Sequence, residues 1–299
     1  MPQDKPRNDN NNMSKKRKIR SYNLLRKFDN YLPGWGGMLV LLALFIAGGI
    51  LGSLAGLLIA GFAPELLNYN IIIVYPIMFL PPLIYASVKS STVPYSQRGI
   101  SFIDRSHLSG KNLAIIALVA SLATIAAAII VEPVVSFLPQ MPTWLEDTLQ
   151  NLMQDSPLWV TLLSVSIFAP FFEELLCRGL VLRGLAHRTS PANAIIISSI
   201  FFALMHGNPW QAIPAFALGV LFGYVYYKTG SLKLPMLMHA VNNTFSVILT
   251  KMDKFKDLDC IYQGMSSVSY GVLILLMLGV LGGSLYYIYK LPPRTNASA

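Results

Sequence analysis

The sequence predicts an all-α integral membrane protein, a polytopic transmembrane helix bundle of about eight spans. Of its 299 residues, 54% are hydrophobic and only 12% are charged, whereas soluble domains carry roughly 25% charged residues. The apolar residues are also grouped into long runs, and a helix needs roughly 20 such residues to cross a bilayer core of about 30 Å. These observations exclude an ordinary water-soluble globular protein.

Eight apolar runs have about the length that a membrane span requires. They lie at 36–62, 70–88, 113–138, 157–182, 192–207, 211–228, 234–250 and 270–289. We therefore predict that residues 36–290 form a single transmembrane domain. In the first run, Gly48, Gly52 and Gly56 recur every four residues, so they share one helix face and would let a neighbouring helix approach closely.

Residues 1–35 form a polar, basic segment in front of the first run. They carry nine Lys and Arg against three Asp, and residues 8–12 are polar without apolar periodicity. We predict a disordered cytoplasmic tail. A basic tail beside a membrane span more often sets orientation and contacts anionic lipid than it binds nucleic acid. We therefore expect the lipid bilayer as a partner, and we expect no binding of nucleic acid.

The distribution of Lys and Arg predicts that both termini face the cytoplasm. With that orientation the inner segments hold 19 of the 23 Lys and Arg, and the outer loop at 139–156 holds none. Cationic loops resist translocation, so this asymmetry supports eight spans. We expect a multi-pass protein of a bacterial cytoplasmic membrane.

Four of the predicted spans contain polar residues that hydrocarbon disfavours. The third contains only Glu132, near its outer end. The fourth contains Glu173, Glu174 and Arg178; the fifth ends at His206; the seventh contains His239 and Asn243. Ionisable groups inside a bilayer are costly and persist where they face a protein interior or a wet cavity. Six such residues on three spans indicate a polar site within the bundle.

Helical spacing separates the two adjacent glutamates. Glu174 and Arg178 are four residues apart on one face, so Arg178 can neutralise Glu174. Glu173 is rotated by about 100° and lacks that partner. Burial disfavours its charged form, so Glu173 is expected to be a stronger base than in water. His239 and Asn243 also share a face.

Each polar residue also has a purely structural interpretation. A single membrane histidine is often a hydrogen-bonding residue between helices, and a Glu–Arg pair often only holds helices together. Ser or Thr would serve that purpose at a lower desolvation cost. The convergence of two Glu, two His, one Asn and one Arg therefore favours an active site.

The three polar segments resemble the CAAX protease and bacteriocin-processing (Abi) family of intramembrane endopeptidases. The family pattern reads here as Glu173-Glu174-x-x-x-Arg178, Phe202-x-x-x-His206 and His239-x-x-x-Asn243, in the family's order. The resemblance covers a protease-like core at about 157–250. The same three segments also resemble the type II CAAX prenyl endopeptidases, which remove the last three residues of prenylated proteins.

The resemblance implies a role for each of these residues. Glu173 and His206 would activate water, His239 and Asn243 would stabilise the oxyanion, and Glu174 and Arg178 would support the site. The implied activity is hydrolysis of membrane-associated peptides or protein tails, with or without an attached lipid. It implies no cofactor and no metal ion.

Three alternatives stay open. Two His and one Glu could bind zinc, although no His-Glu-x-x-His occurs and His206 and His239 lie on different helices. A catalytically silent scaffold or bacteriocin-immunity protein could keep the fold. A proton-coupled transporter also uses buried Glu and His, but we find no paired broken helices typical of one.

The predicted span ends do not place the catalytic residues at one depth. At 1.5 Å per residue, Glu173 is about 14 Å, His239 about 8 Å and His206 about 21 Å from the inner end of its span. Ser190 followed by Pro191 is a good helix start. We therefore expect the fifth helix to begin outside the bilayer and the cavity to open toward the cytoplasm.

Overall fold

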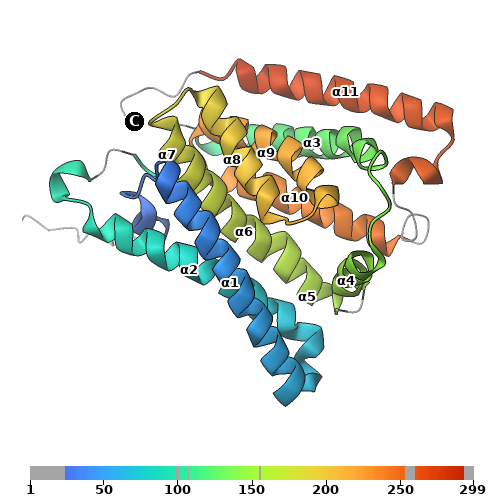
Figure 1. Ribbon diagram of the computed structural model, residues 1–299. Helices are drawn as coiled ribbons and strands as arrows, with labels where there is room; N and C mark the ends of the chain where they lie inside the picture. The colour runs from blue at the N-terminus through green and yellow to red at the C-terminus, as the bar shows by residue number, and fades with distance from the viewer. Residues whose placement is uncertain (1–23, 99–100, 107, 155, 253–259, 293–299) are drawn as a thin grey trace, which may run out of the picture.

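The computed structural model describes residues 24–98, 101–106, 108–154, 156–252 and 260–292, and every regular element within them is a helix (Figure 1). The predicted all-α fold is confirmed. The predicted disorder of residues 1–23 lies outside the described residues.

Each of the eight predicted runs coincides with a helix or a composite helix. The bounds are α1 Trp35–Phe62, α2 Asn70–Thr92, α3 Gly110–Val135, the composite of α5, η4, α6, η5 and α7 at Leu158–Ala186, α8 Pro191–Met205, α9 Pro209–Thr229, α10 Lys233–Lys251 and α11 Ser267–Tyr289. The shorter elements are η1 Leu24–Phe28, η2 Pro64–Tyr69, η3 Tyr95–Gln97, α4 Thr143–Gln154 and η6 Ile261–Gly264.

The described residues contain five helices long and apolar enough to cross a membrane: Trp35–Phe62, Pro64–Thr92, Gly110–Val135, Leu158–Ala186 and Ser267–Tyr289. The protein is therefore an integral membrane protein. α8 has 15 residues and extends only about 22 Å, less than the thickness of a bilayer core. The eight-span count, with both termini inside, stays a prediction.

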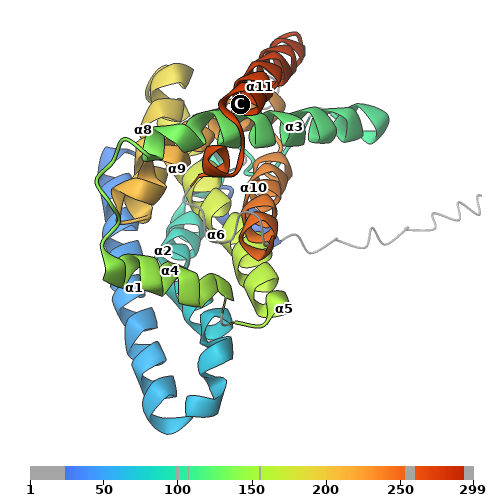
Figure 2. The same ribbon diagram turned by 90° about the vertical axis from the view of Figure 1, so that its right-hand side faces the viewer.

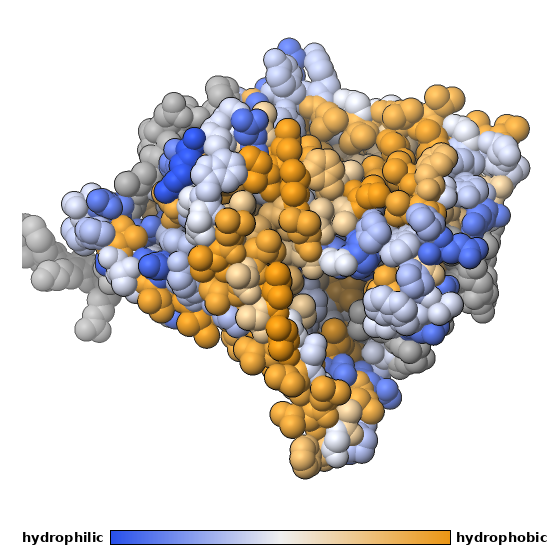
Figure 3. All heavy atoms as spheres, viewed as in Figure 1, coloured by the Kyte–Doolittle hydropathy of each residue, from blue (hydrophilic) through white to orange (hydrophobic). Residues whose placement is uncertain are grey.

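The helices form two groups joined by the composite helix. α1 and α2 pair as a hairpin that extends beyond the others, and α3 packs against α9, α10 and α11 (Figures 1 and 2). Apolar side chains cover much of the face seen in Figure 3, including the length of α1, as expected of a surface in contact with lipid.

The glycines of α1 allow the close pairing with α2. A Cβ atom at Gly48 would lie 2.0 Å from the Met78 carbonyl oxygen, and one at Gly52 would lie 3.1 Å from Val74 Cγ1. The predicted close approach is confirmed at these two positions. At Gly56 a Cβ would meet its nearest neighbour at 3.7 Å, which is ordinary contact.

The composite helix that carries the glutamates changes its hydrogen-bond register around Pro170. η4 (Leu162–Phe168) and η5 (Leu175–Leu182) are π-helical, and the Ala169 N–H bonds to the Ser164 carbonyl. The carbonyl of Val165 then has no helical donor, because Ala169 is taken and Pro170 has no N–H. π-helical turns are frequently found at functional sites.

The turn between α8 and α9 positions His206 at the end of a short helix. Ser190 accepts a hydrogen bond from the Asn193 N–H and Pro191 opens α8, as expected from the sequence. After His206, Gly207 adopts a φ of +68°, which favours glycine. Asn208 then caps α9 by accepting from the Gln211 N–H.

Residues 24–34, which belong to the predicted disordered tail 1–35, are instead folded against the bundle. The buried Arg183 guanidinium donates to the carbonyls of Phe28 and Tyr31 at 2.7 and 2.9 Å. Asp29 accepts from the Ile103 N–H at 2.9 Å. A buried guanidinium needs acceptors, and these residues supply them.

The sequence analysis did not predict α4 (Thr143–Gln154). It is a separate amphipathic helix between α3 and α5. Trp144 is exposed and Leu145 is buried, so α4 presents one face to the protein. Acidic residues interrupt this segment, so its sequence does not form an apolar run.

Candidate active site

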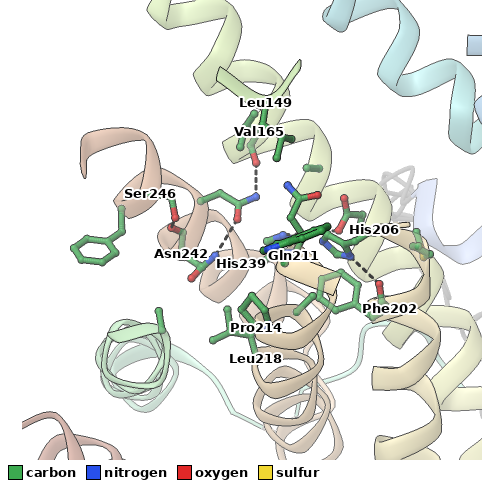
Figure 4. A pocket seen from close by; sticks show the side chains of 18 of the residues that line it. Leu149, Val165, Phe202, His206, Gln211, Pro214, Leu218, His239, Asn242 and Ser246 are labelled. Atoms are coloured by element: carbon green, nitrogen blue, oxygen red, sulfur yellow. Dashed lines mark hydrogen bonds and ion pairs between the residues drawn. The ribbon is translucent and has the colours of Figure 1, made fainter. Parts of the chain in front are cut away.

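One cavity of about 680 Å³ brings the predicted catalytic residues together. Glu173 of the composite helix, His206 at the end of α8, and His239 and Asn243 of α10 all line it; His206 and His239 are labelled in Figure 4. Glu174 and Arg178 are fully buried and lie behind these residues. The six residues therefore form one site, although their sequence positions suggested different depths.

A buried ion pair forms the layer behind the cavity. Arg178 Nη1 lies 2.8 Å from Glu174 Oε1, and both side chains are inaccessible to solvent. The predicted neutralisation of Glu174 by Arg178 is thus confirmed. Arg178 Nη2 also donates to the Gly219 carbonyl at 3.0 Å. The guanidinium lies over the rings of Phe202 and Phe222, 4.5 and 5.5 Å from their centroids, and both contacts favour the cation.

His239 connects the two glutamates. Its Nδ1 lies 3.0 Å from Glu174 Oε1, and because a carboxylate only accepts, this contact assigns a proton to Nδ1. Its Nε2 lies 3.9 Å from Glu173 Oε2. The ring is held between Phe202 and Phe222. The Glu174 contact fixes the orientation of the imidazole and points Nε2 toward Glu173.

His206 is oriented by its own helix. Its Nδ1 lies 2.9 Å from the Phe202 carbonyl oxygen, which can only accept, so Nδ1 carries the proton. In the neutral ring Nε2 is then an acceptor at the cavity. The ring also packs edge-on against Phe202, with centroids 5.0 Å apart (Figure 4).

Glu173 is held by a residue that the sequence analysis missed. The Tyr75 hydroxyl on α2 donates a hydrogen bond to Glu173 Oε1. Within the described part of the chain, the buried Glu173 Oε2 accepts no hydrogen bond. One oxygen is thus anchored, while the other is left for a ligand or a water molecule. The sequence did carry a signal for this contact. Tyr75 lies inside an apolar run, and a buried tyrosine hydroxyl usually finds a hydrogen-bond partner.

Replacing Tyr75 with Phe should lower kcat about 10- to 100-fold while KM stays nearly unchanged. Hydrogen bonds to charged groups contribute about 1.5–3 kcal/mol, and each 1.36 kcal/mol in the barrier is tenfold in rate. Steady-state kinetics and the unfolding temperature would be measured together. Tyr69→Phe, at a partly exposed tyrosine, is the matched control. A loss of stability with normal kcat would show that Tyr75 is merely structural.

Asn243 is oriented by the irregular part of the composite helix. Its Nδ2 donates to the Val165 carbonyl at 2.7 Å, the carbonyl that Pro170 leaves without a helical donor. Its Oδ1 accepts from Asn242 Nδ2 at 3.1 Å (Figure 4). The carboxamide is therefore fixed at both ends, with one amide hydrogen remaining beside the cavity.

The far wall of the cavity includes a third acid, Glu132 of α3. Its Oε1 accepts a hydrogen bond from the Ile261 N–H, and both residues line the cavity together with Leu149 of α4. These residues belong to the segments with few Lys and Arg.

No group of three or more His, Cys, Asp or Glu in the described residues is arranged to hold a metal ion. Both ring nitrogens of His239 face glutamate oxygens, and Nδ1 of His206 faces a carbonyl.

Comparison with known proteins supports the family resemblance. Residues 155–245 match the family model "Type II CAAX prenyl endopeptidase Rce1-like". This segment contains all six site residues, and the resemblance drawn from the motifs is confirmed over it.

Two curated proteins are similar to part of the chain. Identity is 29% over 99 residues with "Putative membrane peptidase YdiL" of Bacillus subtilis (strain 168), covering 33% of this chain and 40% of that protein. It is 35% over 92 residues with "Membrane-embedded CAAX protease MroQ" of Staphylococcus aureus (strain USA300), covering 28% and 36%. The chain thus spans well under half the length of these relatives. No solved structure matches.

Proposed function

We propose that this chain, whose residues 155–245 carry an Rce1-like domain, is a metal-free, glutamate-type intramembrane endopeptidase. Its substrates are membrane-associated peptides or protein tails, with or without an attached lipid. The observation that carries the proposal is that Glu173, His206, His239 and Asn243 line one cavity, with Glu173 Oε2 free of hydrogen-bond partners among the described residues.

In the proposed reaction, water binds between Glu173 Oε2 and His206 Nε2. Glu173 takes a proton from the water as its oxygen attacks the scissile carbonyl, forming a tetrahedral oxyanion. Glu173 then returns this proton to the leaving amine as the C–N bond breaks. Such general acid–base catalysis typically contributes about 10²–10⁴-fold.

The oxyanion would be stabilised from the side of α10. Asn243 has one amide hydrogen that is not used by Val165. His239 Nε2 lies 3.9 Å from Glu173 Oε2, and it would be a second donor whenever that nitrogen carries a proton. Donors directed at a developing oxyanion are among the strongest contributions to amide hydrolysis. Glu174 and Arg178 act as positioning residues, since they hold His239.

The direct test compares peptides from membranes of cells that carry the wild-type protein or Glu173→Ala. Fragments should be present in the wild type and be replaced by their intact precursors in the variant, at equal protein levels. Identical peptide profiles, with any phenotype unchanged, would instead favour the catalytically silent scaffold or immunity protein.

Metal chelation separates the proposed mechanism from the zinc-dependent alternative. Turnover by the purified protein should stay within about twofold after treatment with 1,10-phenanthroline and dialysis, because no step requires a metal ion. His206→Ala should lose about 10²–10⁴-fold in the same assay, as expected when a group that activates water is removed. Loss of turnover on chelation, with recovery on adding zinc, would contradict the metal-free mechanism.

A further inference from the structure

The cavity is built from one end of the bundle. The α3 residues that line it lie within 128–135, at the end of that helix, and the α2 residues lie within 71–78, at its start. α9 contributes from Trp210 onward, and α10 contributes as far as Leu249. Each helix therefore supplies the half that points to the same end, here called the mouth end.

Solvent exposure falls from the mouth end inward. Ser246 is exposed and Leu249 is half-buried, whereas His239 is 5% and Phe222 is 1% exposed. α4 and Ile261 also reach the cavity at the mouth end. Access to the catalytic residues is thus from this end.

Hydrogen bonds show which connecting segments belong to each end. At the mouth end, Trp210 Nε1 donates to the Pro139 carbonyl at 2.9 Å, and Glu132 accepts from Ile261. At the opposite end, Asp104 accepts from the Leu232 N–H at 2.9 Å and lies 3.6 Å from Lys233 Nζ. Arg183, Asp29 and Ile103 meet at that end as well.

The charges at the two ends differ strongly. Among the described residues, the connecting segments of the opposite end hold eleven Lys and Arg: Arg26, Lys27, Lys89, Arg98, Arg105, Lys111, Arg183, Arg188, Lys228, Lys233 and Lys290. At the mouth end, the described residues of 139–154 hold Glu146 and Asp147 and no Lys or Arg, and Lys251 is the one Lys or Arg among the described residues of 251–269. Short loops rich in Lys and Arg stay in the cytoplasm.

We propose that the active-site cavity opens to the extracytoplasmic side of the membrane, so that its substrate is a peptide or protein tail presented from that side. The part of this inference that concerns the substrate rests on the proposed function, whereas the orientation of the cavity does not depend on it. It reverses the opening expected from the sequence, because the cavity lies in the opposite half of the helices.

Cysteine labelling tests the orientation without any activity. Ser246→Cys and Asp147→Cys mark the mouth end, and Lys233→Cys, where the native side chain is 77% exposed, marks the opposite end. The parent protein is the blank, since its Cys177 and Cys260 are buried. Each variant is treated with a membrane-impermeant maleimide in intact spheroplasts, in inside-out vesicles and after solubilisation in detergent.

The expected result is labelling of at least one mouth-end cysteine in spheroplasts, with Lys233→Cys labelled only in inside-out vesicles. The reverse pattern, or labelling of Lys233→Cys alone in spheroplasts, would overturn the proposal.

Blocking the mouth then connects orientation to substrate access. A bulky impermeant maleimide on Ser246→Cys in spheroplasts should reduce cleavage of the substrate found by the membrane comparison by at least tenfold. The same reagent on Lys233→Cys in inside-out vesicles, where that cysteine is labelled, should not reduce it. Normal cleavage with fully labelled Ser246→Cys would overturn access through this mouth. Correct labelling without cleavage in any variant, the unmodified protein included, would leave the orientation in place and refute the peptidase function.

Discussion

Glu173→Gln is expected to abolish peptide hydrolysis, with a fall in kcat of about 10²–10⁴-fold. Gln has the shape of Glu and can still accept the hydrogen bond that Tyr75 donates to Oε1. It cannot, however, take a proton from water at the position of Oε2, the oxygen that has no hydrogen-bond partner among the described residues. Single-turnover rates of the purified protein would measure the loss.

The control is Glu65→Gln, an exposed carboxylate on η2, which should keep normal activity. The unfolding temperature of Glu173→Gln should stay within a few degrees of the wild type, because the fold does not depend on this charge. Turnover by Glu173→Gln above about one tenth of the wild-type rate would exclude Glu173 as the base.

Arg178→Leu is expected to give the largest loss of stability. Glu174 would lose its cationic partner at a site with 0% exposure, and removing one partner of a buried ion pair costs about 3–5 kcal/mol. The Gly219 carbonyl would lose its donor, and two ring contacts would be lost. The free energy of unfolding from denaturant titration in detergent micelles would measure the loss.

A paired variant separates lost charge balance from lost packing. Glu174→Gln combined with Arg178→Met removes both charges, so it should recover at least half of the stability that Arg178→Leu loses. Lys111→Leu, which replaces an exposed lysine, should change the free energy of unfolding by less than about 0.5 kcal/mol. If Arg178→Leu behaved like Lys111→Leu, the buried pair would not be needed for the fold.

The helical fold and the members of the site could be predicted from the sequence because their signals are local. Apolar runs of sufficient length predict helices, and all eight of them formed. The four-residue spacing of Glu174 and Arg178 predicted their ion pair, which forms at 2.8 Å. The spacing of glycines in α1 predicted its close contact with α2.

What could not be predicted depends on how distant segments meet. Tyr75 contacts Glu173 across 98 positions of the chain, and no spacing rule relates them. The apparent differences in depth came from treating each helix as a full span counted from its inner end. α8 has 15 residues and extends only about 22 Å, so its end brings His206 to the cavity.

The π-helical stretch of the composite helix restricts how many residues this part of the helix can contain. A π-helical turn contains one residue more than the corresponding α-helical turn. A one-residue deletion within Leu162–Phe168 would therefore restore α-helical winding. Side chains before the deletion would then be rotated by about 100° relative to Glu173, and the Val165 carbonyl would turn away from Asn243. Homologues that retain this chemistry should therefore conserve the number of residues in this stretch even where their identities differ.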